Sequence, residues 1–139
     1  MTAACNSFKV ELLQAVHNFT ASTGDTFKMA LYSPSASLSV DTTAYSTTNE
    51  ASGPGYSAGG VTLTNVTPVL DDGVAVADFS DAVFSAVTIT LRFALIYNAS
   101  KANRAVAVID LGQTYTVSGG DLLIAMPPAT STNAIIRVT

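Results

Sequence analysis

The stretch Val87-Thr-Ile-Thr-Leu-Arg-Phe-Ala-Leu-Ile-Tyr97 decides the fold class of this chain. Its odd positions, from Val87 to Tyr97, all carry large apolar side chains, whereas Thr88, Thr90 and Arg92 stand between them. Because successive side chains of a strand point to opposite faces, this alternation predicts a β-strand with one face against a core. The stretch is long for a strand of a small sheet, so we expect it to bend.

Further strands are predicted on both sides of this stretch, where apolar runs are separated by Gly, Asn, Asp and Pro. The Asp71-Asp72-Gly73 triplet favours a tight turn between two of them. Seven or eight short strands with such spacing are typical of an antiparallel β-sandwich or barrel. The predicted strands are Phe27–Tyr32, Val61–Thr67, Val74–Phe79, Val87–Tyr97, Ala105–Leu111, Tyr115–Val117, Asp121–Met126 and Ala134–Val138.

One helix is predicted, over residues 7–20, with Asn6 or Ser7 as its N-cap. Its apolar residues recur at steps of three and four, as one face of a helix requires, and they are Phe8, Leu12, Val16 and Phe19. The segment 33–60 is rich in Ser, Thr, Ala and Gly and is expected to be mostly loop, with a short helical turn over 41–48.

The predicted fold class is therefore α+β and mainly β, an antiparallel β-sandwich or barrel of about seven or eight strands with one N-terminal helix. The 139 residues fit a single domain. Within it we expect an N-terminal arm over 1–8, the helix over 7–20 and a β-domain over 26–139.

The composition predicts an unusually neutral surface. Charged residues make up 12% of the chain, about half the usual globular share, while 14 serines and 18 threonines supply most of the polarity. This composition favours a chain that packs against neighbours, and a small secreted or thermally robust β-domain is the alternative. The net charge of −4 argues against nucleic-acid binding, which needs a basic face.

Neither a membrane span nor a targeting signal is predicted. The mean hydropathy is high, +0.39, yet no run of 18 uncharged apolar residues occurs. The N-terminus lacks the basic and apolar regions of a signal peptide, so we expect a chain made in the cytoplasm. The single cysteine, Cys5, excludes an internal disulfide and a Cys-based zinc site, and we expect a free thiol in a mobile end.

No catalytic, cofactor-binding or metal-binding residue is predicted, and the chain is not expected to be an enzyme. His17 is the only histidine, no Gly-x-Ser-x-Gly elbow accompanies it, and we expect it to be a partly exposed helix residue. Asp78 and Asp81 are expected at strand ends or turns, since no calcium-loop pattern surrounds them. The glycine-rich run 53–60 precedes a strand and opens no helix, so it predicts a flexible loop rather than a phosphate site.

Two arginines are candidates for an interface. Arg92 and Arg137 each interrupt a strand of apolar and hydroxyl residues. A guanidinium in such a place suits bidentate pairing with a carboxylate of a partner, and an intramolecular pair or simple solvation is the alternative.

Several characteristic runs are spread over nearly the whole chain beyond the predicted helix. They are Thr23-Gly-Asp-Thr-Phe-Lys-Met-Ala-Leu-Tyr32, Thr42-Thr-Ala-Tyr-Ser-Thr-Thr-Asn-Glu50, Ser52-Gly-Pro-Gly-Tyr-Ser-Ala-Gly-Gly-Val-Thr-Leu63, Ala94-Leu-Ile-Tyr-Asn98, Asn103-Arg-Ala-Val-Ala-Val108 and Ala134-Ile-Ile-Arg137. As a set, these runs resemble small virion proteins of tailed bacteriophages.

The resemblance implies a virion structural protein, and a capsid decoration or cement protein on the outer head surface is the role we expect. Its partners are then the major capsid protein and neighbouring copies of itself, with a trimer favoured. A tail, neck or head-fibre component involved in attachment or host-surface binding is the alternative, in which loop 49–60 and Tyr45, Tyr56 and Tyr97 would serve a host-surface sugar. An adhesin-like or enzymatic role without a virion is a third reading. The interface candidates are Phe8 in the N-terminal arm, Arg92, Arg137, Tyr45 and Tyr56.

Overall fold

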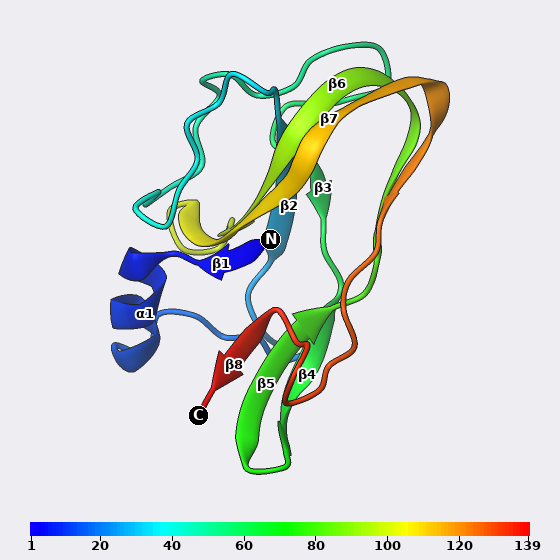
Figure 1. The fold of residues 1–139 in the computed structure, drawn as a ribbon. Coiled ribbons are helices and arrows are strands. Elements are labelled where there is room, and N and C mark those ends of the chain that lie inside the picture. The colour runs from blue at the N-terminus through cyan, green and yellow to red at the C-terminus, as the bar shows by residue number, and fades with distance from the viewer.

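A long antiparallel hairpin dominates the computed structural model, which describes residues 1–139 (Figure 1). Its strands are β6 (Ala82–Asn98) and β7 (Arg104–Ile124), paired from Asn98↔Arg104 beside the turn to Ala82↔Ile124 at the far end. The predicted stretch 87–97 lies wholly inside β6. The expected bend is confirmed, because the register shifts between Leu91 and Phe93, and Figure 1 shows that the β6–β7 hairpin arches along its length.

Eight strands form two antiparallel sheets, which confirms a mainly β sandwich with one N-terminal helix. The larger sheet has the order β1-β7-β6-β2-β3, with β1 at Thr2–Ala4, β2 at Phe27–Tyr32 and β3 at Val61–Thr62. The smaller sheet has the order β4-β5-β8, with β4 at Asn65–Asp71, β5 at Val74–Phe79 and β8 at Ile136–Val138. The strands β1, β3, β4 and β8 are therefore sheet edges.

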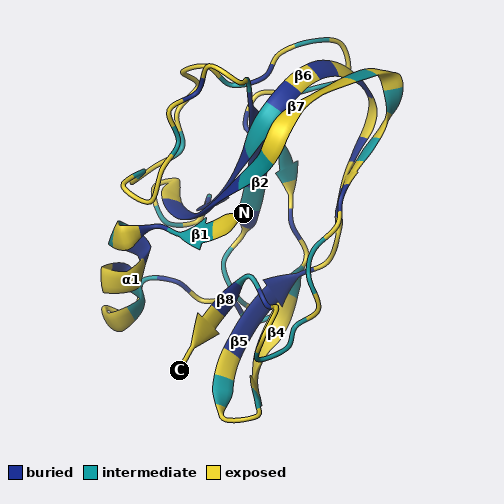
Figure 2. Cartoon of the chain, viewed as in Figure 1, coloured by how far each residue is buried: buried dark blue, intermediate teal, exposed yellow.

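Phenylalanine rings join the two sheets in the core. Phe27 of β2 stacks on Phe19 with ring centroids 4.5 Å apart, and it lies 5.5 Å from Phe79 of β5. Phe8 meets Phe19 edge-on at 5.9 Å, which fixes the helix against the same cluster. Figure 2 shows the buried residues along β5, whereas the neighbouring edge strand β4 is exposed.

The helix is shorter than predicted. α1 spans Asn6–Leu13, its N-cap is Cys5, and no side chain caps it. The prediction of a helix over 7–20 was wrong because the chain adopts a left-handed conformation at Ala15, with φ of 58°. Phe19 is buried as the apolar pattern required, but it reaches the core from the connection to β2. α1 is neither long nor apolar enough to cross a membrane.

The N-terminal arm is not free. Residues 2–4 form strand β1, which pairs with β7 from Thr2↔Ile109 to Ala4↔Ala107. Cys5 follows with no exposed surface, and its N–H donates to the carbonyl of Val106. The expectation of a mobile end was therefore wrong, because the edge of β7 offers hydrogen-bond partners to this segment.

Strand boundaries differ from the prediction mainly where pairing partners decide them. The strands predicted over 27–32 and 74–79 match β2 and β5, and residues 71–73 form the expected turn. The three segments predicted between 105 and 126 are one strand, β7, while 61–67 divides between β3 and β4. Residues 41–48 contain no helical turn, and Ala44 instead bridges to Arg104.

Candidate functional site

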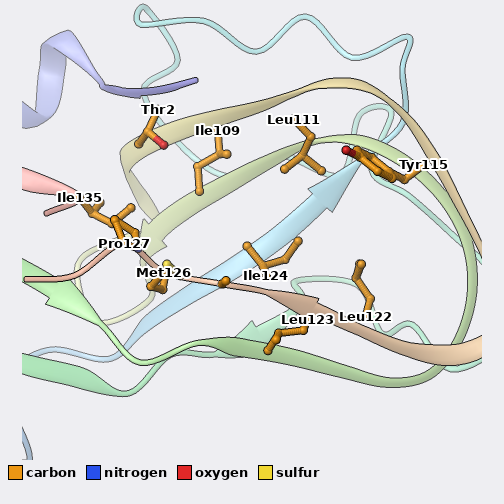
Figure 3. A pocket seen from close by; sticks show the side chains of 11 residues that line it. Thr2, Ile109, Leu111, Tyr115, Leu122, Leu123, Ile124, Met126, Pro127 and Ile135 are labelled. Carbon is orange, nitrogen blue, oxygen red and sulfur yellow. The ribbon is translucent and has the colours of Figure 1, made fainter. Parts of the chain in front are cut away.

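An apolar groove opens between β1, the far part of β7 and the segment that follows β7 (Figure 3). Its volume is about 310 Å³. Nine of its eleven lining residues are hydrophobic and none is acidic or basic. The lining residues are Thr2, Ile109, Leu111, Tyr115, Leu122, Leu123, Ile124, Ala125, Met126, Pro127 and Ile135.

The groove exists because β7 is much longer than β1, the strand that pairs with its outer edge. Strand β1 pairs with Ala107 to Ile109, and Met1 adds backbone hydrogen bonds to Asp110, so β7 has no strand partner on that side beyond Asp110. At the rim of the groove, Leu123 is 56% exposed and faces Val83, which is 50% exposed, across the β6–β7 ladder. We call these two residues the apolar ridge. Groove and ridge together form an apolar surface free of charge, which is suited to contact with another protein.

Arg92 is paired within the chain. It lies where the β6–β7 register shifts, and its Nε and Nη2 atoms donate to the two carboxylate oxygens of Asp110 at 3.1 and 3.2 Å. The hydrogen bonds from Arg92 hold the pKa of Asp110 below its usual range, and the same bonds raise the pKa of Arg92. Arg92 therefore forms an intramolecular ion pair, the alternative to pairing with a carboxylate of a partner.

The other interface candidates divide between the surface and the interior. Arg137 of β8 is exposed, makes no ion pair and donates to the carbonyl oxygen of Thr132. Phe8 is only 1% exposed, so its side chain is not open to a partner in this structure. A clamp built on Phe8 would require it to leave the phenylalanine cluster of the core.

Tyr45 and Tyr56 converge on Glu50 and hold the long loop against the sheet. The Tyr45 hydroxyl donates to Oε2 of Glu50 and the Tyr56 hydroxyl to Oε1, each at 2.7 Å, and the Gly59 N–H also donates to Oε1 at 2.7 Å. The ring of Tyr45 stacks on Tyr97 with centroids 4.7 Å apart. Burial, then the neighbouring carboxylate, raises the pKa of both tyrosines. The hydroxyls of both tyrosines are therefore engaged within the chain, while their rings remain partly exposed.

His17 belongs to a buried polar cluster between the end of α1 and the β6–β7 turn. The Asn98 amide donates to Nδ1 of His17 at 3.0 Å, so Nε2 carries the proton and donates to Glu11 at 3.1 Å. Asn98 also donates to Asp25, which Lys101 contacts at 3.1 Å, and Arg104 reaches Glu11 at 2.8 Å.

The His17 side chain has no exposed surface, so the prediction of a partly exposed helix histidine was wrong. Every member of the cluster has a partner, and the cluster has no opening to the apolar groove. It joins the N-terminal segment to the large hairpin and is a structural feature.

Two further groups have altered acidity and lie in the interior. Burial raises the pKa of the Cys5 thiol to about 11, which keeps it protonated at neutral pH. Burial also raises the pKa of Asp78, which is 2% exposed near the end of β5 and accepts the Phe79 N–H. Asp81 accepts the N–H of Met126. The negative charge of the neighbouring Asp81 also raises the pKa of Asp78.

The groove residues were not singled out by the sequence analysis. The run Leu122-Leu123-Ile124 is the one signal that could have found them, because three consecutive apolar residues in an alternating strand place at least one on the outer face. Thr2 and Ile135 reach the groove because β1 pairs with β7 and β8 pairs with β5. These pairings join segments far apart in the sequence, so no local pattern predicts them.

Comparison of the chain with family models, with curated proteins and with solved structures finds no match.

Proposed function

We propose that this protein is a bacteriophage capsid decoration protein that bridges and stabilises major capsid protein subunits on the head surface. The observation that carries the proposal is the uncharged apolar groove with its exposed ridge of Val83 and Leu123. The resemblance of the sequence to virion proteins of tailed phages supplies the context. The role needs binding surfaces and no catalytic site.

The absence of charge in the groove and ridge fits this role, because groups in a contact between subunits lose their water. Each charge that is buried between subunits costs free energy unless it is paired, whereas apolar surface gains about 25 cal/mol for every Å² removed from water. The groove and ridge present no charge that such a contact would have to desolvate. Repetition of this contact over a shell adds up through multivalency, even if one contact is weak.

The proposal is tested first by the copy number of the protein in purified virions, measured by mass spectrometry against the major capsid protein. A ratio near that of the capsid lattice supports a decoration protein. Tens of copies or fewer would replace it with a tail, neck or head-fibre role. Absence from virions would remove both roles.

The surface is tested by binding of the purified chain to shells that lack it. Leu123→Asp places a charge on the ridge, and we expect it to abolish binding and the gain in shell stability. Val40→Asp is the control, because Val40 is also an exposed apolar residue, 39% exposed, but lies outside the groove. Equal binding by L123D and the wild type would show that the groove is not the contact.

A further inference from the structure

A second groove lies between α1 and β8, and we call it the α1–β8 groove. Its volume is about 650 Å³, and Leu12, Leu13, Ile136 and Val138 contribute apolar surface to it. Leu13 is 91% exposed and Val138 is 48% exposed. The groove is open because β1 and β8 are edge strands of different sheets, and no strand is paired with their outer sides (Figure 1).

Two basic side chains that form no ion pair line this groove. The chain has six basic side chains, and Arg92, Lys101 and Arg104 form ion pairs within the chain. Lys9 and Arg137, two of the other three, line the α1–β8 groove. Lys9 donates only to the Asn6 side chain and Arg137 only to a backbone carbonyl. The groove therefore suits an apolar segment that carries an acidic residue.

The turn between β4 and β5 has that chemistry. Leu70, 74% exposed, and Val69, 53% exposed, precede the turn, and Asp72 lies within it. Of the ten acidic side chains, Asp72 alone makes no hydrogen bond or ion pair in the chain. Figure 1 shows that this hairpin tip projects away from α1. We call residues 69–73 the acidic tip.

We infer that the acidic tip of one copy docks into the α1–β8 groove of a second copy. Leu70 packs against Leu13 and Val138, and the Asp72 carboxylate lies between the Lys9 ammonium and the Arg137 guanidinium. Two cations around one carboxylate offset the cost of removing it from water. Within one chain Asp72 contacts neither Lys9 nor Arg137, whose only partners are Asn6 and Thr132, so we place the contact between copies.

The contact is head-to-tail, because the tip and the groove are different surfaces. Each copy then offers its tip to one neighbour and its groove to another, which produces a closed ring or an open chain. The inference rests on the proposed function in that it supplies the contact between neighbouring copies. It is tested on the isolated chain, so the two can fail separately.

The test is sedimentation equilibrium of the purified protein and of two charge-reversed variants. Asp72→Lys gives a basic tip with the natural groove, and Lys9→Glu with Arg137→Glu gives an acidic groove with the natural tip. We expect the wild type to self-associate and each variant alone to raise the dissociation constant at least about tenfold, because like charges then meet. A mixture of the two variants restores association, since each tip again meets a groove of opposite charge.

Asp121→Lys is the control for charge, because it gives the same net charge as D72K at an exposed position outside the groove, and it also removes the hydrogen bond that Asp121 accepts from the Ala86 N–H. It is expected to associate like the wild type, and Leu70→Ser is expected to weaken association without any change of charge. A monomeric wild type, unaltered association of D72K, equal weakening by D121K or failure of the mixture to associate would each overturn the inference. If the groove variant does not fold, D72K and L70S decide.

The virion measurements separate this inference from the proposed function. A self-associating chain that is absent from virions would remove the proposed function and leave the contact. A chain that is monomeric in solution yet present in hundreds of copies per virion would remove the contact and leave the function.

Discussion

Glu50 is the residue whose removal should most damage the long loop that precedes β3. Its carboxylate accepts three hydrogen bonds of 2.7 Å, from the hydroxyls of Tyr45 and Tyr56 and from the N–H of Gly59. A hydrogen bond to a charged group contributes about 1.5–3 kcal/mol, and deletion of the acceptor leaves its donors unsatisfied. Because the site is partly exposed and the bonds are not additive, we expect Glu50→Ala to cost about 3–5 kcal/mol.

Glu50→Gln is the matched control. Its Oε1 still accepts from Tyr56 and Gly59, and the Tyr45 hydroxyl can rotate to accept from the new amide. The expected cost is about 1–2 kcal/mol, which reflects the loss of charge assistance. A large difference between the two variants is therefore the signature of this hydrogen-bond arrangement.

Urea unfolding followed by circular dichroism measures both costs. With a slope of about 2 kcal/mol per molar urea, E50A should lower the midpoint by about 2 M and E50Q by less than about 1 M. A shift below about 0.5 M for E50A, or equal shifts for both variants, would refute the reasoning.

Three more predictions follow from local geometry and acidity. Gly60→Ala should lower the free energy of unfolding by at least about 3 kcal/mol, because the new Cβ would overlap the Met29 carbonyl oxygen. Gly73→Ala, also at positive φ but with open space around it, should lower it by about 1–2 kcal/mol. Thermal unfolding measures both. Burial opposes ionisation of Asp25, but the hydrogen bonds to its carboxylate and the neighbouring Lys101 ammonium outweigh burial and lower the pKa of Asp25. The stability that the ionised carboxylate contributes is present above its unfolded pKa of about 3.9 and is lost as the pH falls. Asp25→Asn should therefore flatten the acid side of a curve of unfolding free energy against pH. The buried Cys5 thiol should react with a disulfide reagent at neutral pH only as fast as the protein unfolds, and a rapid reaction of the native protein would contradict its burial.

The sequence predicted the parts of the fold that local patterns encode. Apolar runs that end at turn residues placed β2 and β5 at their observed bounds, and alternation placed 87–97 inside β6, because both patterns are local properties of the sequence. The Asp71-Asp72-Gly73 turn was predicted for the same reason, since Asp72 and Gly73 both adopt positive φ. The length of Val87–Tyr97 also indicated the bend that Arg92 marks in the structure.

The helix shows where a local pattern misleads. The apolar spacing through Phe19 is real, and Phe19 is buried, yet α1 ends at Leu13. The chain leaves the helix so that His17 can reach Glu11 and Asn98 and so that Phe19 can stack on Phe27. These contacts join segments far apart in sequence, so the 3.6-residue period alone does not contain them.

The sequence by itself determined that the chain is mainly β, that its charges are few and where most strands run. The tertiary structure alone decided which strands are edges, and with them the apolar groove beside β7 and the α1–β8 groove. It also decided that Cys5, Phe8 and His17 are interior residues. The physical reason is that a strand's alternation specifies which face is buried, whereas pairing partners and edges depend on contacts between distant segments.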